Sequence, residues 1–427
     1  MFKFIHAADI HLDSPLHGLE RYEGAPVEEI RGATRRALDN LVQLAIDEEV
    51  NFVIIAGDLY DGNWRDHNTG LFFVSRVVKL REAGIPVFVI SGNHDAASKM
   101  TRSLPLPKNP GGTKVMLSDK KAETIPLEGL GVAIHGQGFA KAIIEDNVIP
   151  QYPVARAGYF NIGILHTSLD LESEGEHARY APCALNDLKA KGYQYWALGH
   201  IHQRATRATN PVVAFPGNVQ GRHIGETGAK GCLLVSVGDD QAVQTDFRPL
   251  DVFRWQLCPV RAERALRRDD VLEAFTTELT RQIAANEGLP LAVRVIIEGP
   301  CPAHQRLQSD PLALANDIRA AALDVGGGSV WVEKVKLHTS PARVLDEKSL
   351  AEGPIGELLS LIRELKVNDE PLVALGQEFE ELERKLPDDV RHGPEAIRLN
   401  DLSQLRASLD EVQSLLLARL QPQGAEQ

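Results

Sequence analysis

Five short stretches of the sequence carry side chains that bind metal ions, and each stretch follows an apolar run. They read HAADIHLD at 6–13, GDLYDG at 57–62, SGNHD at 91–95, LHTS at 165–168 and GHIHQR at 199–204. The candidate ligands among them are two aspartates, one asparagine and four histidines: Asp9, His11, Asp58, Asn93, His166, His200 and His202. Seven oxygen and nitrogen donors exceed the needs of one tetrahedral zinc, but they suit two divalent ions that share a bridging carboxylate.

Two metals about 3.5–4 Å apart can clamp a phosphate, activate a water between them and absorb the charge of an in-line displacement. The donor set therefore indicates hydrolysis of a phosphoester. Mixed histidine and aspartate ligands favour manganese, iron or zinc over calcium. A His-x-His pair on a strand places both imidazoles on one face, so we expect His200 and His202 to reach neighbouring metals and Asp9 and His11 to repeat that geometry.

Each of these features has a plainer interpretation when it is taken alone. A single histidine at a strand end is usually a core or surface residue, and Gly-Asp and Gly-Asn are common turns. The interpretation as a metal centre depends on all five stretches converging, which the carboxyl ends of strands in an α/β sheet allow.

The remaining histidines lack this context. His6 and His135 lie within apolar runs and are expected in the core. Surface or loop positions are expected for His17, His67, His177, His304, His338 and His392. His223, in the glycine-rich PGNVQGRHIG, has two interpretations: a turn that brings backbone amides to a phosphate, or a plain hairpin, which is the favoured one.

The elements that must position these residues alternate between strands and helices. Residues 3–7, 27–49, 51–57, 69–84 and 85–91 read as βαβαβ. Further strand-like runs lie at 131–136, 161–167, 193–199, 211–217 and 230–238. Few helical patterns separate these later runs, so we expect a second sheet packed on the first.

The chain after residue 250 has a different organisation. A strand, helix, strand, helix, strand pattern over 251–340 predicts a separate small α/β domain. Residues 341–427 are helical and charged, with apolar stripes that a lone helix cannot bury and that need a partner surface in this chain or another. We therefore expect three regions: 1–250, 251–340 and 341–427.

Composition limits the class of protein. A hydrophobic fraction of 43% and a charged fraction of 25% are ordinary for a globular protein, and no apolar run is long enough to span a bilayer. The N-terminal residues show no signal peptide pattern, so the cytoplasm is the expected compartment.

The cysteines are widely spaced, and Cys183, Cys232, Cys258 and Cys301 are expected to be reduced core residues. A net charge of −13 counts against nucleic-acid binding by bulk electrostatics, unless bound cations neutralise an acidic cleft.

The five stretches together resemble the calcineurin-like metallophosphoesterases. The matching patterns, in order, are D-x-H from Asp9, G-D-x-x-D from Gly57, G-N-H-D from Gly92, the single His166, and G-H-x-H from Gly199. Within that family the chain looks most like the SbcD-type DNA repair exonucleases and their YhaO-like branch. The resemblance implies a four-layer αββα catalytic domain, two Mn²⁺ ions, a domain that caps the DNA cleft, and a coiled-coil ATPase partner of the SbcC or YhaN kind.

The same resemblance implies a role for each site residue. Asp9, His11, Asp58 and His202 would hold one metal. Asp58, Asn93, His166 and His200 would hold the other, with Asp58 as the bridge. His94 would act at the scissile phosphate as a catalytic residue, and Asp61 would orient His94 or a ligand by a hydrogen bond.

Three functions remain open from the residues alone. The first is a metal-dependent DNA nuclease, and the second is a metallophosphoesterase that acts on a nucleotide or another small phosphoester. The third is a scaffold that regulates an ATPase through its helical tail, although seven intact metal donors argue against it. A homodimer is left open as a further partner arrangement.

Overall fold

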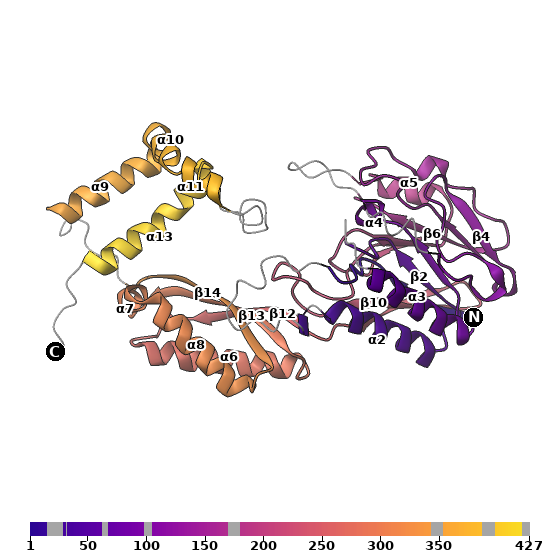
Figure 1. The fold of residues 1–427 in the computed structure, drawn as a ribbon, viewed down its shortest axis with the longest axis horizontal. Coiled ribbons are helices and arrows are strands. Elements are labelled where there is room, and N and C mark those ends of the chain that lie inside the picture. Colours follow the sequence, from indigo (N-terminus) through magenta and orange to yellow (C-terminus); the bar gives the residue numbers. More distant parts are fainter. Residues whose placement is uncertain are drawn as a thin grey trace. The chain divides into compact units, whose positions relative to one another are not determined.

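The chain folds into two compact units. The computed structural model describes residues 1–14, 29–30, 32–61, 67–97, 105–169, 180–342, 353–386 and 398–420. Within these ranges the first unit ends at Arg254 and the second begins at Trp255 (Figure 1). Each unit has a hydrophobic core of its own. No helix of the described ranges is long and apolar enough to cross a membrane.

The first sheet of the first unit has five strands in the order β11-β10-β1-β2-β3. Its strands are β1 (Phe2–Ala7), β2 (Phe52–Ala56), β3 (Val87–Ile90), β10 (Gly231–Val237) and β11 (Val243–Pro249). The first three are parallel, and β10 runs antiparallel to β1. Parallel neighbours need crossover connections, and the helices α2 (Ala33–Asp47) and α3 (His67–Glu82) provide them. The predicted βαβαβ order is confirmed.

Helix α2 packs on this sheet through a regular apolar stripe. Leu38, Leu41, Val42 and Ala45 are spaced three or four residues apart, and all four are buried. They share a core cluster with strand residues such as Val53. Burial of this face, rather than helix propensity, accounts for most of the stability of such a helix.

The second sheet has six strands in the order β4-β5-β6-β7-β9-β8. Its strands are β4 (Glu123–Leu127), β5 (Val132–Gly136), β6 (Phe160–His166), β7 (Tyr195–Gly199), β8 (Ala205–Thr209) and β9 (Val212–Phe215). Strands β5, β6, β7 and β9 are mutually parallel. The sequence patterns did not indicate β4, β8 and β11, because these edge strands bury few side chains and lack a clear apolar alternation.

The two sheets pack face to face. Phe4 and Phe52 of the first sheet stack with ring centroids 4.9 Å apart, and Tyr195 of the second sheet meets Phe4 edge-on. The outer face of the second sheet is covered by α5 (Leu185–Ala190), by the short 3-10 helix η4 (Ile149–Gln151) and by loops. The four-layer αββα architecture is confirmed, with one outer layer much thinner than the other.

The interior of the first unit contains two of the predicted core histidines. His6 is buried, with Nδ1 2.9 Å from the Tyr195 hydroxyl and Nε2 3.1 Å from the Leu198 carbonyl oxygen. It therefore joins the two sheets by hydrogen bonds, and burial lowers its pKa to about 3. His135 is likewise buried, and its Nε2 lies 2.9 Å from Asn161 Oδ1.

The second unit contains a three-stranded sheet in the order β12-β13-β14. Its elements are β12 (Arg254–Arg261), α6 (Arg268–Ala285), β13 (Leu291–Cys301), α7 (His304–Ser309), α8 (Pro311–Gly326) and β14 (Val330–Pro341). Phe275 of α6 and Ile318 of α8 pack against Val293 and Val295 of β13. The predicted alternation of this region is confirmed, with the additional short helix α7.

Most of the expectations for the remaining histidines and the cysteines can be compared with the structure. The four cysteines are free and buried, as predicted. His338 is exposed, as predicted. The surface position predicted for His304 is wrong: its ring is buried, with Nδ1 2.9 Å from Thr339 Oγ1, because α7 packs against β14. His17, His177, His392 and the side chain of His67 lie outside the described residues.

The chain after β14 is helical, as predicted. Its helices are α9 (Pro354–Val367), α10 (Asp369–Glu378), α11 (Glu380–Lys385) and α13 (Leu402–Leu420). Ile362, Leu372, Leu405 and Leu409 form a small buried cluster between α9, α10 and α13. The apolar stripes therefore find part of their partner surface within the tail itself.

We expect Gly163→Ala to destabilise the first unit. A methyl group at this β6 position would lie 2.3 Å from the ring of the buried Trp196, and overpacking of this kind costs about 1–3 kcal/mol. Gly129→Ala is the matched control, because its added carbon would meet nothing within 4 Å. Thermal unfolding followed by tryptophan fluorescence tests this. Equal midpoints for the two variants would contradict the close packing of β6 on Trp196.

Candidate metal centre

The candidate site lies where the parallel strands of both sheets end. Asp9 and His11 follow β1, Asp58 and Asp61 follow β2, and Asn93 and His94 begin α4 (Asn93–Ala97) just after β3. His166 is the last residue of β6, and His200 and His202 follow β7. Because parallel strands present their carboxyl ends at one edge, residues up to 191 positions apart come into contact.

The ligands are held by backbone that is not extended. Asp9, His11, Asp58 and His200 have φ angles of 51°, 46°, 48° and 100°, in or near the left-handed region that residues other than glycine rarely adopt. Each such residue costs about 1–3 kcal/mol and persists only where the surroundings hold it. The prediction that strand alternation aligns Asp9 with His11 and His200 with His202 is therefore wrong. Both pairs lie beyond their strands, and loop conformation sets their directions.

Backbone hydrogen bonds hold these loops in place. The amides of Asp9 and His11 donate to the carbonyl oxygens of Gly57 and Asp58, each at 3.0 Å. The loop after β1 thus continues to pair with the loop after β2. The His200 amide donates to the Asp9 carboxylate at 3.1 Å, which ties the first sheet to the second at the site.

Two glycines next to the ligands allow the close approach. A methyl group at Gly92 would lie 2.2 Å from Asp58 Oδ1, and one at Gly199 would lie 1.9 Å from the Ala56 carbonyl oxygen. No side chain fits at either position without moving the backbone. These contacts explain why glycine precedes Asn93 and His200.

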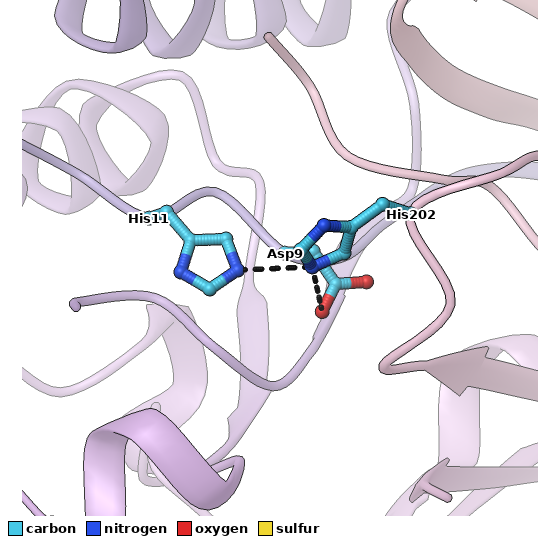
Figure 2. Close-up of side chains that lie close together, drawn as sticks. All are labelled: Asp9, His11 and His202. Atoms are coloured by element: carbon cyan, nitrogen blue, oxygen red, sulfur yellow. Dashed lines mark hydrogen bonds and ion pairs between the residues drawn. The ribbon is translucent and has the colours of Figure 1, made fainter. Parts of the chain in front are cut away.

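The first donor group consists of Asp9, His11 and His202 (Figure 2). The Nε2 atoms of the two imidazoles are 3.2 Å apart, and His202 Nε2 is 3.9 Å from Asp9 Oδ1. His202 Nδ1 lies 2.7 Å from Glu226 Oε1. Since a carboxylate only accepts, Nδ1 donates to Glu226 and Nε2 faces Asp9 and His11.

The second donor group consists of Asp58, His166 and His200, with Asn93 beside it. His166 Nδ1 lies 3.0 Å from the Ala56 carbonyl oxygen, so this nitrogen donates and Nε2 faces the other donors. His166 Nε2 is 2.9 Å from Asn93 Oδ1 and 3.3 Å from Asp58 Oδ2. Carbonyl, carboxylate and imidazole donors therefore converge on one point.

Asp58 links the two groups. Its Oδ2 atom lies 3.3 Å from His166 Nε2 and 3.9 Å from His11 Nε2, and its Oδ1 atom accepts the His94 amide at 3.0 Å. The side chain is 2% exposed, so no solvent competes for it. This carboxylate is in place to bridge two cations.

Burial and mutual charge displace the pKa values of these groups. Burial raises the pKa of Asp9 to about 6 and lowers that of His200 to about 3. Burial opposes a charge on His166, but the Asp58 carboxylate overcomes it and raises the pKa of His166 to about 9. Burial likewise opposes ionisation of Asp58, yet the imidazoles of His166, His11 and His94 hold its pKa well below the usual range.

The donor set fits divalent cations. Buried lone pairs of Asp9, Asp58, Asn93 and four imidazoles face one another, and on His166 a cation would replace the proton that Nε2 otherwise carries. Imidazole with carboxylate suits manganese, iron or zinc. The residues present therefore fit two metal ions, one in each group, with Asp58 shared.

His94 and Asp61 lie together at the edge of the donor groups. His94 Nδ1 is 2.7 Å from Asp61 Oδ1, and the His94 side chain is 41% exposed. The hydrogen bond that His94 donates to the Asp61 carboxylate raises the pKa of His94 more than burial lowers it. Asp61 and His94 also form a candidate metal group with His11, but Ser14 and Arg222 already occupy the second Asp61 oxygen.

Asp95, the last residue of the SGNHD stretch, joins two loops of the site. Its buried carboxylate accepts the amides of Gly92, Leu59 and Tyr60 at 2.9, 3.1 and 2.8 Å. The turn that carries Asn93 and His94 is thereby fastened to the loop that carries Asp58.

Sequence reasoning missed Arg222 and Glu226. Both lie in the loop between β9 and β10, where Glu226 accepts from His202 and from Arg222 Nη2, the latter at 3.0 Å. The plain hairpin favoured for His223 is wrong, because β9 and β10 belong to different sheets. A charged pair within a glycine-rich segment was the available signal, but its meaning depends on the sheet packing that folds this loop against His202.

Comparison with known proteins shows the family of this chain. Residues 2–204 match the family described as Calcineurin-like phosphoesterase, and residues 255–340 match Metallophosphoesterase YhaO, middle domain. The "Uncharacterized metallophosphoesterase YhaO" of Bacillus subtilis is 35% identical over 301 residues, which cover 70% of this chain and 72% of that protein. The chain belongs to the calcineurin-like metallophosphoesterases. Members of this family are hydrolases of phosphoester bonds that use a dimetal centre, and the donor groups around Asp58 are the candidate dimetal centre of this one.

Two archaeal proteins described as DNA double-strand break repair protein Mre11 are also similar to this metallophosphoesterase. The one from Aeropyrum pernix is 28% identical over 57% of this chain and 60% of its own length. The one from Methanopyrus kandleri is 24% identical over 390 residues, which cover 85% of this chain and 76% of that protein.

We expect Asp58→Ala to lose both metal ions together, because one carboxylate serves both donor groups. His202→Ala should empty mainly the group of Asp9 and His11. His304→Ala removes a buried imidazole of the second unit and is the control that should keep both metals. Metal analysis of the purified, manganese-loaded variants measures the difference. Two metals per chain in the Asp58 variant would remove the bridging assignment.

Proposed function

We propose that this protein is a manganese-dependent DNA nuclease that hydrolyses phosphodiester bonds, acting as an exonuclease in DNA repair. The observation that carries the proposal is the buried Asp58 carboxylate between two donor groups, with the half-exposed His94 beside them. Two metals across a shared carboxylate and an accessible imidazole can together catalyse hydrolysis of a phosphodiester.

We assign the side chains of the site two roles in this reaction, metal binding and proton donation. Asp9, His11, Asp58 and His202 would hold one metal, and Asp58, Asn93, His166 and His200 the other. When bound, the metals supply Lewis acidity and a nucleophilic water at neutral pH. His94 donates a proton or a charged hydrogen bond to the leaving oxygen. Its Nδ1 is held by Asp61 at 2.7 Å, which leaves Nε2 for the substrate.

A cavity lies near the turn that carries Asn93 and His94, and its lining contains neither of these two residues nor any other metal-donor candidate. Its volume is about 450 Å³, within the range of ordinary ligand pockets. Ser91 and Asp95 of its lining flank Asn93 and His94 in the chain, and Phe139 of its lining meets the His166 ring edge-on. Lys114, Asp119 and Lys120 also line it, and Lys114 forms an ion pair with Glu123, so its wall carries mixed charge.

Similarity beyond the catalytic unit supports DNA as the substrate. The alignment with the Methanopyrus kandleri protein spans 390 residues, more than the first unit contains, so it includes part of the second unit. That relative is described as a DNA double-strand break repair protein. We propose that the second unit of this chain contributes to holding DNA.

We further propose that the helical tail binds a coiled-coil ATPase of the SbcC or YhaN kind. Leu361 and Val367 of α9 and Val412 of α13 remain 52%, 79% and 42% exposed after the tail helices have packed on one another. Exposed apolar side chains on a helical surface suit a helical partner.

We expect His94→Ala to keep its metals and to cleave DNA at least about a hundredfold more slowly, since general acid catalysis is worth about 10²–10⁴-fold. Asn93→Ala should loosen a metal instead. The assay incubates each variant with manganese and end-labelled single- and double-stranded DNA, beside bis(p-nitrophenyl) phosphate. Cleavage of the small ester with no cleavage of either DNA would favour the alternative, a small-molecule phosphodiesterase or phosphomonoesterase. An unchanged rate in His94→Ala would refute the role of His94.

We expect removal of the tail after residue 341 to leave a metal-loaded enzyme that no longer retains an SbcC-like protein. The metal donors all lie in the first unit. Buried tail residues pack on one another, and α13 also packs on α7. A pull-down with full-length and shortened chains measures retention. Equal binding by both would exclude the tail as the partner site, and aggregation of the shortened chain would show that the tail covers the second unit.

A further inference from the structure

Arg222 lies between two carboxylates that serve different parts of the site. Its Nη1 atom donates to Asp61 Oδ2 at 3.2 Å, and its Nη2 atom donates to Glu226 Oε1 at 3.0 Å. The Arg222 side chain is 14% exposed, so the guanidinium lies within the site and is not a surface cation.

Each carboxylate in turn contacts one functional imidazole. Glu226 lies 2.7 Å from Nδ1 of the metal-ligand candidate His202, and Asp61 lies 2.7 Å from Nδ1 of His94. Arg222 therefore contacts both carboxylates: the one that binds the metal-ligand candidate His202 and the one that binds the proposed proton donor His94. Because the guanidinium is planar with donors in a fixed fork, it holds the two carboxylates in a defined relation.

Asp61 has a second imidazole within reach. His11 Nδ1 is buried without a hydrogen-bond partner among the described residues, and it lies 3.8 Å from Asp61 Oδ1. When His11 Nε2 serves a metal, Nδ1 carries the ring proton and needs an acceptor. A small rotation of Asp61 would satisfy His11 at the expense of His94.

We propose that Arg222 is a positioning residue that prevents this rotation. Together with the Ser14 hydroxyl, it holds Asp61 Oδ2, so that Oδ1 stays directed at His94. Arg222 thereby sets the alignment of His94 toward the leaving oxygen. This inference rests on the proposed role of His94 and does not depend on DNA being the substrate.

The metal ligands have support that does not need the guanidinium. Glu226 Oε2 also accepts the Asn218 side-chain amide at 2.9 Å and the Arg222 backbone amide at 2.8 Å. Both bonds persist when only the Arg222 side chain is changed. Arg222→Met should therefore leave His202 oriented and the metals bound while it releases Asp61.

The experiment compares two esters of thymidine 5′-phosphate that differ in how much they need a proton donor. p-Nitrophenolate leaves without a proton, whereas phenolate gains from protonation. Arg222→Met should lower kcat for the phenyl ester by about 10- to 100-fold, the usual cost of losing an orienting contact. KM, metal content and kcat for the p-nitrophenyl ester should stay close to those of the parent protein. Lysine cannot reach both carboxylates with a fork of donors, so Arg222→Lys should rescue only partly.

Arg76→Met is the matched control, since Arg76 is an ion-paired guanidinium on α3 that contacts Asp39 and Phe72. It should change kcat for neither ester.

In a His94→Ala background, Arg222→Met should have no further effect on kcat for the phenyl ester, because the two residues act in the same step. Equal loss of kcat on both esters, loss of metal, or a raised KM would each overturn the proposal. These outcomes would make Arg222 a structural, metal-supporting or substrate-binding residue respectively. Failure of the parent protein to cleave DNA, while it still cleaves both esters, would bear on the proposed function and not on Arg222.

Discussion

The site depends on the buried Asp58 carboxylate. One of its oxygens faces imidazoles from two different sheets, at 3.3 Å from His166 Nε2 and 3.9 Å from His11 Nε2. A buried carboxylate needs nearby positive charge or donors to remain ionised. The neighbouring imidazoles and the His94 amide provide part of this, and two cations with a shared bridge would provide the rest. The two groups of ligands are therefore one electrostatic unit.

That unit requires two sheets to meet closely at their carboxyl ends. The aromatic rings of Phe4, Phe52 and Tyr195 fill the space between the sheets, and His6 adds hydrogen bonds across it. The ligands then extend from loops whose left-handed residues cost about 1–3 kcal/mol each. This local cost is offset by the large buried core beneath them, which also explains why glycines such as Gly92 and Gly199 occur at the points of closest approach.

Hydrogen bonds from neighbouring side chains fix the orientation of the candidate ligands. Asp95 joins the turn of Asn93 to the loop of Asp58, Glu226 selects the proton position on His202, and Arg222 connects Glu226 to Asp61. These side chains have low exposure, and each hydrogen bond fixes a group that faces the donors. The second unit has a hydrophobic core of its own.

The sequence by itself determined the donors, their order and the alternation of strands and helices. Residue types and spacing are local properties, and the convergence of Asp9, Asp58, Asn93, His166 and His202 follows once the strands are parallel. The sequence also determined the four-layer class and the α/β alternation of residues 251–340. The expected core positions of His6, His135 and the four cysteines were identified in the same way, because residues within apolar runs are usually buried.

Only the tertiary structure decided the remaining features. The left-handed backbone at Asp9 and His200 depends on contacts with a neighbouring loop, so strand periodicity gave the wrong geometry there. The roles of Arg222 and Glu226 appeared only when β9 and β10 were seen in different sheets, which turns an apparent hairpin into a loop over the site. His304 is buried because α7 packs on β14. In each case the deciding contact joins residues whose proximity depends on packing, and no local pattern of residue types records it.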